Sequence, residues 1–408
     1  MQKYFLLLFI TVSFLGAMVN HPHSVVIDSI QSDSHDFPLR FIAFGDNYSV
    51  NSTFIEFIDY VNDHLADSID FAMGVGDFAA GGELSKYNEY LDIIDGANFP
   101  ILNTIGNHEV NDDAGEDNFI DIFGPSDYYF DYMDCRFIGL QNSHPASIPD
   151  ISGEYMRYEL TESQLTWYES LVSEWDGKVF AFMHAPPYLR GHITLGTMGG
   201  SGYNPYGSGP SGSDEFIRIN RDHNVSMVFA GHLHCYDRWQ PDDDIHGETV
   251  YFITGGAGAP INPWPYLAPY GGDFNHFMLI EVNEDGSVDG RIYKLGEEAG
   301  HDPDYDFHYD SSELSLFDEP NIVYHPTMTD AKAYQKGDEI YVKFGTPTRQ
   351  YVRVGLYDVN GRIIERQRRM AGIGVSKFIF DLPIRSGIYM VRIQAENEEF
   401  TRKVNIVH

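Results

Sequence analysis

The sequence has few cysteines and few basic residues for its length of 408 residues. With only 2 cysteines a disulfide framework is excluded, and a bond between Cys135 and Cys235 is the one pairing left open. Lysine and arginine number 26 against 61 aspartates and glutamates, which gives a formal net charge of −35. This excess of negative charge argues against nucleic acid or an anionic membrane surface as a general partner.

Long apolar runs are also scarce, and the one present lies at the N-terminus, from Tyr4 to Val19. It follows the cation Lys3 and is too short for a comfortable membrane span. We therefore expect residues 1–22 to be a secretory signal peptide that is cleaved between Ala17 and His23, with a retained anchor as the alternative. No later segment is long and apolar enough to cross a bilayer, so we expect an exported protein with no stable membrane span.

Beyond the N-terminus, buried apolar runs alternate with segments whose apolar residues recur at helical spacing. The expected strands include residues 39–46, 69–77, 99–109, 135–141, 178–187, 225–234 and 249–256, and the expected helices include residues 52–65, 81–94 and 161–175. This alternation is typical of an α/β domain with largely buried strands. We place the domain at residues 38–296, where a hairpin over residues 276–295 closes a sheet.

The C-terminal part of the chain has a different pattern. Residues 297–321 are acidic and poor in helical periodicity, so we expect a linker there. Short alternating strands follow over residues 322–408 and predict a small all-β domain. Residues 343–408 contain 12 basic and 6 acidic residues, which leaves 14 and 55 in residues 1–342. The two regions carry formal charges of +6 and −41, which indicates two domains with different roles.

Polar side chains gather where the expected strands of the α/β domain end. Asp46 and Asp77 end the first two strands, each directly after a glycine. The further candidates at strand ends are Asn107, His108, Glu109, His184, His232 and His234. Each alone has an ordinary explanation as a turn residue, a helix cap or a satisfied core histidine. Because ligands of open α/β sheets bind at the carboxyl ends of the strands, we expect these groups to converge.

The ordered motifs "GD", "GD", "GNHE", "MHAPPY" and "GHLHCYDR" resemble those of the calcineurin-like metallophosphoesterase superfamily, most closely its purple acid phosphatase branch. The resemblance covers about residues 39–296 and implies an α/β fold, a four-layer α/β/β/α sandwich that holds two metal ions. It implies that the first metal is bound by Asp46, Asp77 and His234. Asp77 would bridge to the second metal, which Asn107, His184 and His232 complete.

Imidazole and carboxylate ligands together suit Zn²⁺, Fe or Mn²⁺, so the identity of the two ions stays open. Two ions about 3.5–4 Å apart can clamp the attacking and leaving oxygens of a phosphoryl displacement, with a bridging hydroxide as nucleophile. The resemblance makes His108 a catalytic group that stabilises charge or protonates the leaving alkoxide, a role worth about 10²–10⁴-fold in rate.

We therefore expect a secreted, acid phosphatase-like phosphoric ester hydrolase that acts on phosphate monoesters. Two alternatives stay open from the sequence. One is a phosphodiesterase on the same scaffold, and the other is a non-catalytic surface protein with a vestigial metal site.

One position departs from the pattern of the purple enzymes. They carry a tyrosine ligand three residues after the second aspartate, where this sequence has Ala80. Other branches have a histidine two residues after the first aspartate, where this sequence has Tyr48. The first metal has therefore either lost a ligand, with Tyr48 an ordinary partly buried phenol, or recruited Tyr48 in its place.

An insertion over residues 190–216, rich in glycine, serine and tyrosine, directly follows the His184 motif. Long loops within compact domains are often functional, so this segment could form a rim over the substrate, with Arg190 or His192 reaching the phosphate. A plain surface loop is the equal alternative.

The segments "IVYHPTMTDA", "YVRVGLYDVNGRIIERQ" and "GIYMVRIQAENEEFTRKVNIV" resemble the C-terminal type A sorting domain of the Bacteroidetes type IX secretion system. Its usual "YPNP" opening is replaced here by "YHPT". The resemblance implies a small Ig-like β-sandwich that the export machinery recognises, and hence a secreted or cell-surface protein. A generic accessory domain, such as a carbohydrate-binding one, is the alternative.

Overall fold

The computed structural model describes residues 20–33, 35–48, 51–111, 114–146, 155–187, 198, 212–239, 247–261, 271–296, 299–310, 329–336, 339–346, 350–358, 362–371, 374–381, 386–394 and 399–406. The apolar run of the expected signal peptide lies outside these residues, as do Arg190 and His192.

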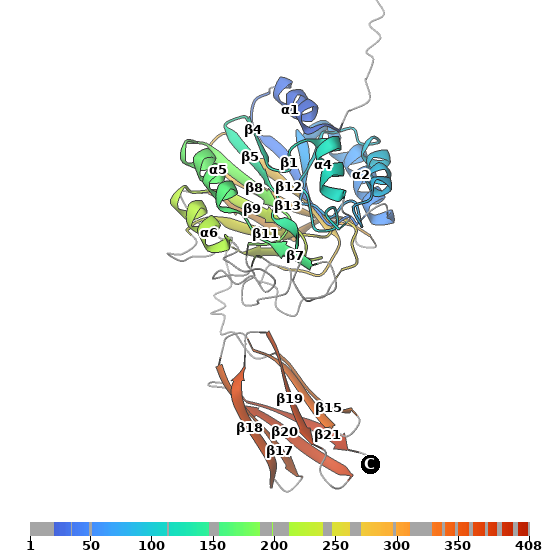
Figure 1. Ribbon diagram of the computed structural model, residues 1–408, viewed down its shortest axis with the longest axis vertical. Helices are drawn as coiled ribbons and strands as arrows, with labels where there is room; N and C mark the ends of the chain where they lie inside the picture. The colour runs from blue at the N-terminus through green and yellow to red at the C-terminus, as the bar shows by residue number, and fades with distance from the viewer. Residues whose placement is uncertain are drawn as a thin grey trace, which may run out of the picture.

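Two six-stranded sheets form the core of the N-terminal domain (Figure 1). The first sheet has the order β14-β13-β12-β1-β2-β3, in which β1, β2 and β3 are parallel and β12, β13 and β14 are antiparallel. Its strands are β1 (Leu39–Phe44), β2 (Phe71–Gly74), β3 (Ile101–Asn103), β12 (His276–Val282), β13 (Val288–Lys294) and β14 (Gly300–Tyr309).

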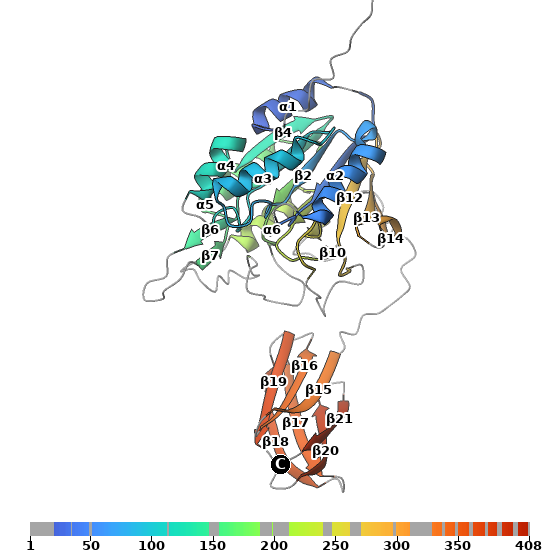
Figure 2. The same cartoon turned by 90° about the vertical axis from the view of Figure 1, so that its right-hand side faces the viewer.

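Three helices cover the outer face of this sheet (Figure 2). They are α2 (Ser52–His64), α3 (Leu84–Ile94) and α4 (Gly115–Phe123), and the short 3-10 helix η1 (Ala66–Ser68) follows α2. The side chain of Asn51 caps α2 by accepting a hydrogen bond from the backbone N–H of Phe54. Phe57 and Val61, four residues apart on α2, are buried against the sheet, as helical periodicity predicts.

The second sheet has the order β10-β11-β9-β8-β5-β4 and is covered by two helices. Its strands are β4 (Tyr128–Tyr132), β5 (Cys135–Leu140), β8 (Lys178–Met183), β9 (Met227–Ala230), β10 (Tyr236–Trp239) and β11 (Val250–Thr254). The covering helices are α5 (Glu162–Ser173) and α6 (Ser213–Asp222). Thr161 and Gln164 form a reciprocal capping box at the start of α5.

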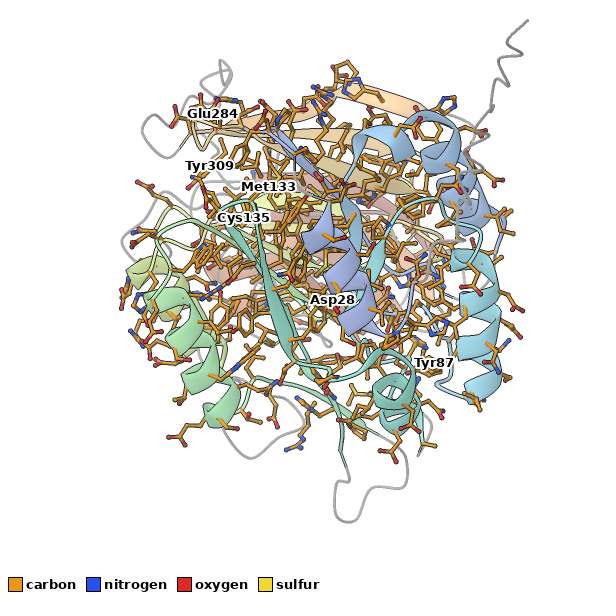
Figure 3. The ribbon with its side chains drawn as sticks, turned by 90° about the horizontal axis from the view of Figure 1, so that it is seen from above. Asp28, Tyr87, Met133, Cys135, Glu284 and Tyr309 are labelled. Atoms are coloured by element: carbon orange, nitrogen blue, oxygen red, sulfur yellow. The ribbon has the colours of Figure 1, made fainter. Side chains whose placement is uncertain are left out.

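The two sheets pack face to face through a shared apolar layer. The ring centroids of Phe41 on β1 and Phe180 on β8 lie 5.1 Å apart, and Phe180 stacks on Phe137 of β5. Helices on the outer faces and two sheets inside make the predicted α/β/β/α sandwich, which is thereby confirmed. Cys135 and Cys235 are both buried free thiols, so the disulfide that the sequence left open is not formed. Cys135 is the first residue of β5, directly after the β4–β5 turn (Figure 3).

The expected linker at residues 297–321 is wrong over residues 300–309. This segment forms β14, the sixth strand of the first sheet, and pairs with β13. Phe307 and Tyr309 are buried, while most of the residues between Gly300 and Asp306 are partly or fully exposed. An edge strand with one face in solvent can carry many charged residues. The acidic composition of this segment therefore led to the incorrect prediction of a linker. Residues 311–321 lie outside the described part of the chain.

The folded domain also begins earlier than the predicted residue 38. Helix α1 (His23–Ser32) contacts β3 and β4. Ahead of it, Asn20 is buried, donates a hydrogen bond to the carbonyl of Ile94 and accepts one from the N–H of Ile101. The helix was missed because it is short, with only Val26 and Ile30 as fully buried apolar residues, and its ends carry no side-chain cap.

The C-terminal domain is all-β, as predicted, and its strands pair antiparallel. A three-stranded sheet, β15-β16-β19, and a four-stranded sheet, β18-β17-β20-β21, enclose a separate apolar cluster. The strands are β15 (Thr329–Lys336), β16 (Glu339–Thr346), β17 (Gln350–Asp358), β18 (Ile363–Ala371), β19 (Gly374–Asp381), β20 (Gly387–Gln394) and β21 (Glu399–Ile406). Within the ranges given above, no helix has the length and apolar character that crossing a bilayer requires.

Candidate metal centre

The predicted ligands meet at the carboxyl ends of the strands and form two groups. Asp46, Asp77 and His234 make one group, and Asp77, His184 and His232 make the other. Within each group the potential ligand atoms all lie within 4.8 Å of one another. Asp77 belongs to both groups, which is the arrangement expected of a bridging carboxylate.

Three of these residues have a left-handed backbone conformation that side chains other than glycine rarely adopt. The φ angles are 56° at Asp46, 58° at Asp77 and 68° at His232. Glycine precedes each of them and permits close packing: a Cβ on Gly45 would lie 2.2 Å from a methyl carbon of Val75. Strained turns of this kind cluster at functional sites, where the surrounding structure holds them.

In the first group, hydrogen bonds fix both Asp46 and His234. The Asp46 carboxylate is fully buried, and both of its oxygens lie 2.9 Å from the backbone N–H of His232. Nδ1 of His234 lies 2.9 Å from the carbonyl oxygen of Pro260, while its Nε2 lies 3.6 Å from Oδ1 of Asp46. A carbonyl bound to one ring nitrogen fixes the ring so that the other nitrogen can bind a metal.

In the second group, lone pairs crowd around one point. Nδ1 of His184 donates to the carbonyl oxygen of Val75 at 2.9 Å, which leaves its Nε2 directed into the site. That Nε2 lies 2.9 Å from Oδ1 of Asn107 and 3.2 Å from Nδ1 of His232. Nδ1 of His232 is itself 2.7 Å from the same Asn107 oxygen. Two ring nitrogens and an amide oxygen thus meet at one point, and their lone pairs can all bind one metal ion when the rings are neutral, so the donor set fits a metal.

The titration behaviour of the site also indicates a missing positive charge. Burial raises the pKa of Asp46 well above its ordinary value. Burial acts in the same direction on Asp77, but the neighbouring His184 holds the pKa of Asp77 below its ordinary value. Burial alone would lower the pKa of His184, yet Asp77 raises it to about 9. A proton on His184 thus balances the buried carboxylates, and a bound metal ion would take over that role.

The Glu109 carboxylate joins the two loops that carry the candidate ligands. It is fully buried; Oε2 accepts the backbone N–H groups of Asp77 at 2.8 Å and Gly106 at 2.7 Å, and Oε1 accepts that of Ala79 at 2.6 Å. The sequence placed Glu109 at a strand end but assigned it no role. Its position in "GNHE" was the available signal, whereas its partners could be identified only from the folded chain.

The structure places His108 and Tyr48 beside the first group. Nε2 of His108 lies 3.8 Å from Oδ2 of Asp77, and burial lowers the His108 pKa. Tyr48 has a φ of 54°, and its backbone N–H donates to the carbonyl oxygen of Asp77 at 2.8 Å. Its ring centroid lies 4.3 Å from that of His108 and 5.8 Å from that of His234. Tyr48 therefore faces the candidate centre, a position that is compatible with the role of metal ligand that the sequence analysis left open for it.

A hairpin that the sequence did not single out flanks the second group. It is formed by β6 (Ser143–Ala146) and β7 (Tyr155–Tyr158). Asn142, directly before β6, exchanges two hydrogen bonds with the backbone of Ala185, next to His184. The Tyr158 ring lies 4.8 Å from the ring of His232 and so packs against a candidate ligand.

Comparisons with known proteins agree with this geometry. Residues 32–236 match the calcineurin-like phosphoesterase family, and residues 336–407 match the secretion system C-terminal sorting domain. A curated protein of Fibrobacter succinogenes, described as a probable cyclic nucleotide phosphodiesterase, is 24% identical over 210 residues, which cover 51% of this chain and 72% of that protein.

Among solved structures, a purple acid phosphatase from yellow lupin (Lupinus luteus) seeds has a TM-score of 0.53 and 16% sequence identity to this chain. The match covers 67% of this chain but only 54% of the lupin chain. At this identity the likeness shows a shared fold.

Proposed function

This chain belongs to the calcineurin-like phosphoesterase family, and we propose that it is a secreted dinuclear-metal enzyme that hydrolyses phosphate monoesters. The observation that carries the proposal is the position of Asp77, which is common to two groups of candidate ligands at the carboxyl ends of the strands.

In this proposal one ion is held by Asp46, Asp77 and His234, and the other by Asp77, Asn107, His184 and His232. When bound, two such ions supply a Lewis-acidic clamp for phosphoryl oxygens and lower the pKa of a nucleophilic water. The metals are Zn²⁺, Fe or Mn²⁺, all of which accept imidazole and carboxylate ligands.

His108 is the proposed general acid and charge stabiliser. Its ring is within 3.8 Å of Asp77 but belongs to neither group of ligand atoms, so it is free to face the substrate. It would hold a proton at Nε2 and transfer it to the leaving oxygen as the phosphorus–oxygen bond breaks. Glu109 would act as a positioning residue, because its carboxylate ties the Asp77 loop to the loop before Asn107.

A second candidate activity is hydrolysis of phosphodiesters. It is favoured by the Fibrobacter relative, which is described as a probable cyclic nucleotide phosphodiesterase. The vestigial-site alternative is the weakest of the three, because every predicted ligand in the described residues reaches the centre.

Export is the proposed role of the two ends of the chain. The sorting domain indicates secretion or display at the cell surface. We propose that a signal peptide precedes Asn20 and is cleaved ahead of it, because the Asn20 side chain is buried among backbone groups of the catalytic domain. The catalytic domain would then span residues 20–310.

Metal analysis combined with a substrate panel tests the activity. The purified protein should carry two metals per chain and hydrolyse p-nitrophenyl phosphate with a kcat/KM at least about tenfold above that for bis(p-nitrophenyl) phosphate or cyclic AMP. Asp77→Asn should lose metal and activity together. Asp127→Asn, at a carboxylate that belongs to neither group of candidate ligands, is the matched control and should keep both. A reversed substrate preference would favour the diesterase, and a metal-free inactive protein would support the vestigial site.

A further inference from the structure

One face of the four-stranded sheet in the C-terminal domain is covered by cations. Along β17, Val352, Val354 and Leu356 are buried in the domain core, so the residues between them face outward. The outward positions of all four strands include five exposed basic residues. These residues, which we call the basic face, are Arg353, Arg366, Arg368, Arg392 and Lys403.

The register of the strands brings these charges together. Arg353 on β17 lies directly opposite Arg368 on β18. Arg366 and Arg392 lie on either side of Gly355, from the strands that flank β17. Like charges directly opposite each other destabilise a sheet, so the arrangement has a cost to folding that an anionic partner would offset.

Two acidic side chains of this sheet have hydrogen-bond partners outside the basic face. Asp358 accepts a hydrogen bond from the N–H of Arg362 at the β17–β18 turn. Glu365 lies opposite the buried Leu356, and its carboxylate accepts from the Gln367 side chain. Five exposed cations of this domain, within a chain of formal charge −35, therefore share one face of the sheet.

The composition around the cations favours a protein partner over a membrane. The Tyr357 ring covers Gly355, and its hydroxyl lies 3.4 Å from a guanidinium nitrogen of Arg366. The same face carries the half-buried Met390 and the exposed Ile363 and Ile388. Arginine, tyrosine and methionine are enriched in protein interfaces, whereas lysine is depleted. Arginine also pairs with carboxylates through two parallel hydrogen bonds, which a lysine cannot do.

We propose that the basic face is the docking surface for an acidic protein of the export machinery, whose carboxylates pair with Arg353, Arg366 and Arg368. This inference rests on the proposed export role of the C-terminal domain and specifies the surface and the chemistry that perform it. The strongly acidic catalytic domain of the same chain would be repelled by such a partner, which leaves the C-terminal domain as the part that binds.

The test compares two variants of the full chain with the same change in charge. The face variant carries Arg353→Gln, Arg366→Gln and Arg368→Gln. The control variant carries Lys86→Gln, Arg221→Gln and Arg291→Gln, at three cations of the catalytic domain that are each at least one-third exposed. In the native host, the face variant should accumulate inside the cell at least about tenfold more than the wild type or the control.

A binding measurement uses labelled poly-L-glutamate as the probe. Wild type and control should bind it at low ionic strength, and the face variant should bind at least about tenfold more weakly, with a difference that disappears in about 0.5 M salt. Thermal unfolding of the face variant should match or exceed that of the wild type, because the opposed pair Arg353 and Arg368 has been neutralised. That result separates a lost interface from a lost fold.

Three outcomes would overturn the inference. The face variant could be exported and bind poly-L-glutamate like the wild type. Vesicles of phosphatidylglycerol and phosphatidylcholine in equal amounts could bind the face while poly-L-glutamate does not, which would make it a membrane surface. Sedimentation could show self-association that the face variant abolishes, which would make the partner a second copy. Deletion of residues 336–407 distinguishes the two levels: if that deletion is exported normally, the export role itself fails.

Discussion

The ring of Tyr48 lies edge to face against the ring of His108, with 4.3 Å between their centroids. His108 is the proposed general acid, and its backbone N–H donates to Oδ1 of Asp77 at 2.9 Å. The same residue therefore contacts the candidate metal centre through its main chain and, in the proposed function, would act on the substrate through its side chain. The two contributions can be separated by substitution.

His108→Ala removes the imidazole but keeps the backbone N–H that donates to Asp77. We expect the variant to retain two metals per chain while kcat on phosphate esters falls at least about tenfold. Metal analysis and steady-state kinetics check this, with His223→Ala, at the end of α6 and outside both ligand groups, as the control. Loss of metal together with activity would show that His108 is a ligand.

Tyr48→Phe decides how the first ion is held. We expect the wild type to be colourless, to carry divalent ions, and to keep its metal content and activity within about threefold after this substitution, because three other side chains form the first group. Absorption spectra and metal analysis check this.

A visible charge-transfer band that Tyr48→Phe removes would instead make Tyr48 a ligand to Fe³⁺. A purple wild type whose colour survives the substitution would contradict both versions.

Glu109→Gln replaces one carboxylate oxygen, which accepts a backbone N–H, with an NH₂ group that can only donate. Since Oε1 serves Ala79 and Oε2 serves both Asp77 and Gly106, either orientation of the glutamine leaves a buried N–H facing another donor. We expect metal affinity to fall about 10- to 100-fold, as measured by competition with a chelator. Glu116→Gln on α4 is the control, and equal affinities in the two variants would remove the positioning role from Glu109.

Acid should destabilise the domain through His23. Burial lowers the pKa of His23 to about 3 from an ordinary value of 6.5, and its Nε2 accepts the N–H of Asn103. Between these pH values the unfolded chain binds a proton that the native state does not, so stability falls as the pH falls, by about 1.4 kcal/mol per unit. Urea unfolding of the chelated protein at several pH values checks this. His23→Gln should show a shallower pH dependence than the wild type, whereas the exposed His64→Gln should not differ from it.

A chain of residues 20–310 should fold and act on phosphate esters without the C-terminal domain, because both sheets and both outer helical layers lie within it. A chain that starts at residue 21 loses the two buried hydrogen bonds of Asn20 and should be less stable by about 2 kcal/mol. Thermal and urea unfolding of the two chains make the comparison. Equal stability would show that the domain begins at α1 and would leave the cleavage site open.

The sequence by itself located most of the candidate centre and the fold class. Each predicted ligand follows an apolar strand, often after a glycine, and both features are local patterns that survive without knowledge of the partners. Since the carboxyl ends of strands in an α/β domain share one edge, local position was enough to predict that Asp46, Asp77, His184, His232 and His234 meet. The C-terminal strands were equally predictable, because the alternation of apolar and polar residues with a period of two is a local signal.

Only the tertiary structure decided what depends on distant contacts. The three backbone partners of Glu109 include Asp77, 32 positions away, and the Asn107 oxygen meets His232 across 125 positions. Strand β14 was hidden because an edge strand exposes one face and can be built from acidic residues. The orientation of Tyr48 toward the centre depends on its left-handed backbone and on its hydrogen bond to Asp77. Secondary-structure propensities of the sequence predict neither feature. Local sequence patterns were therefore enough to identify the candidate ligands, whereas long-range packing determined their partners and orientations.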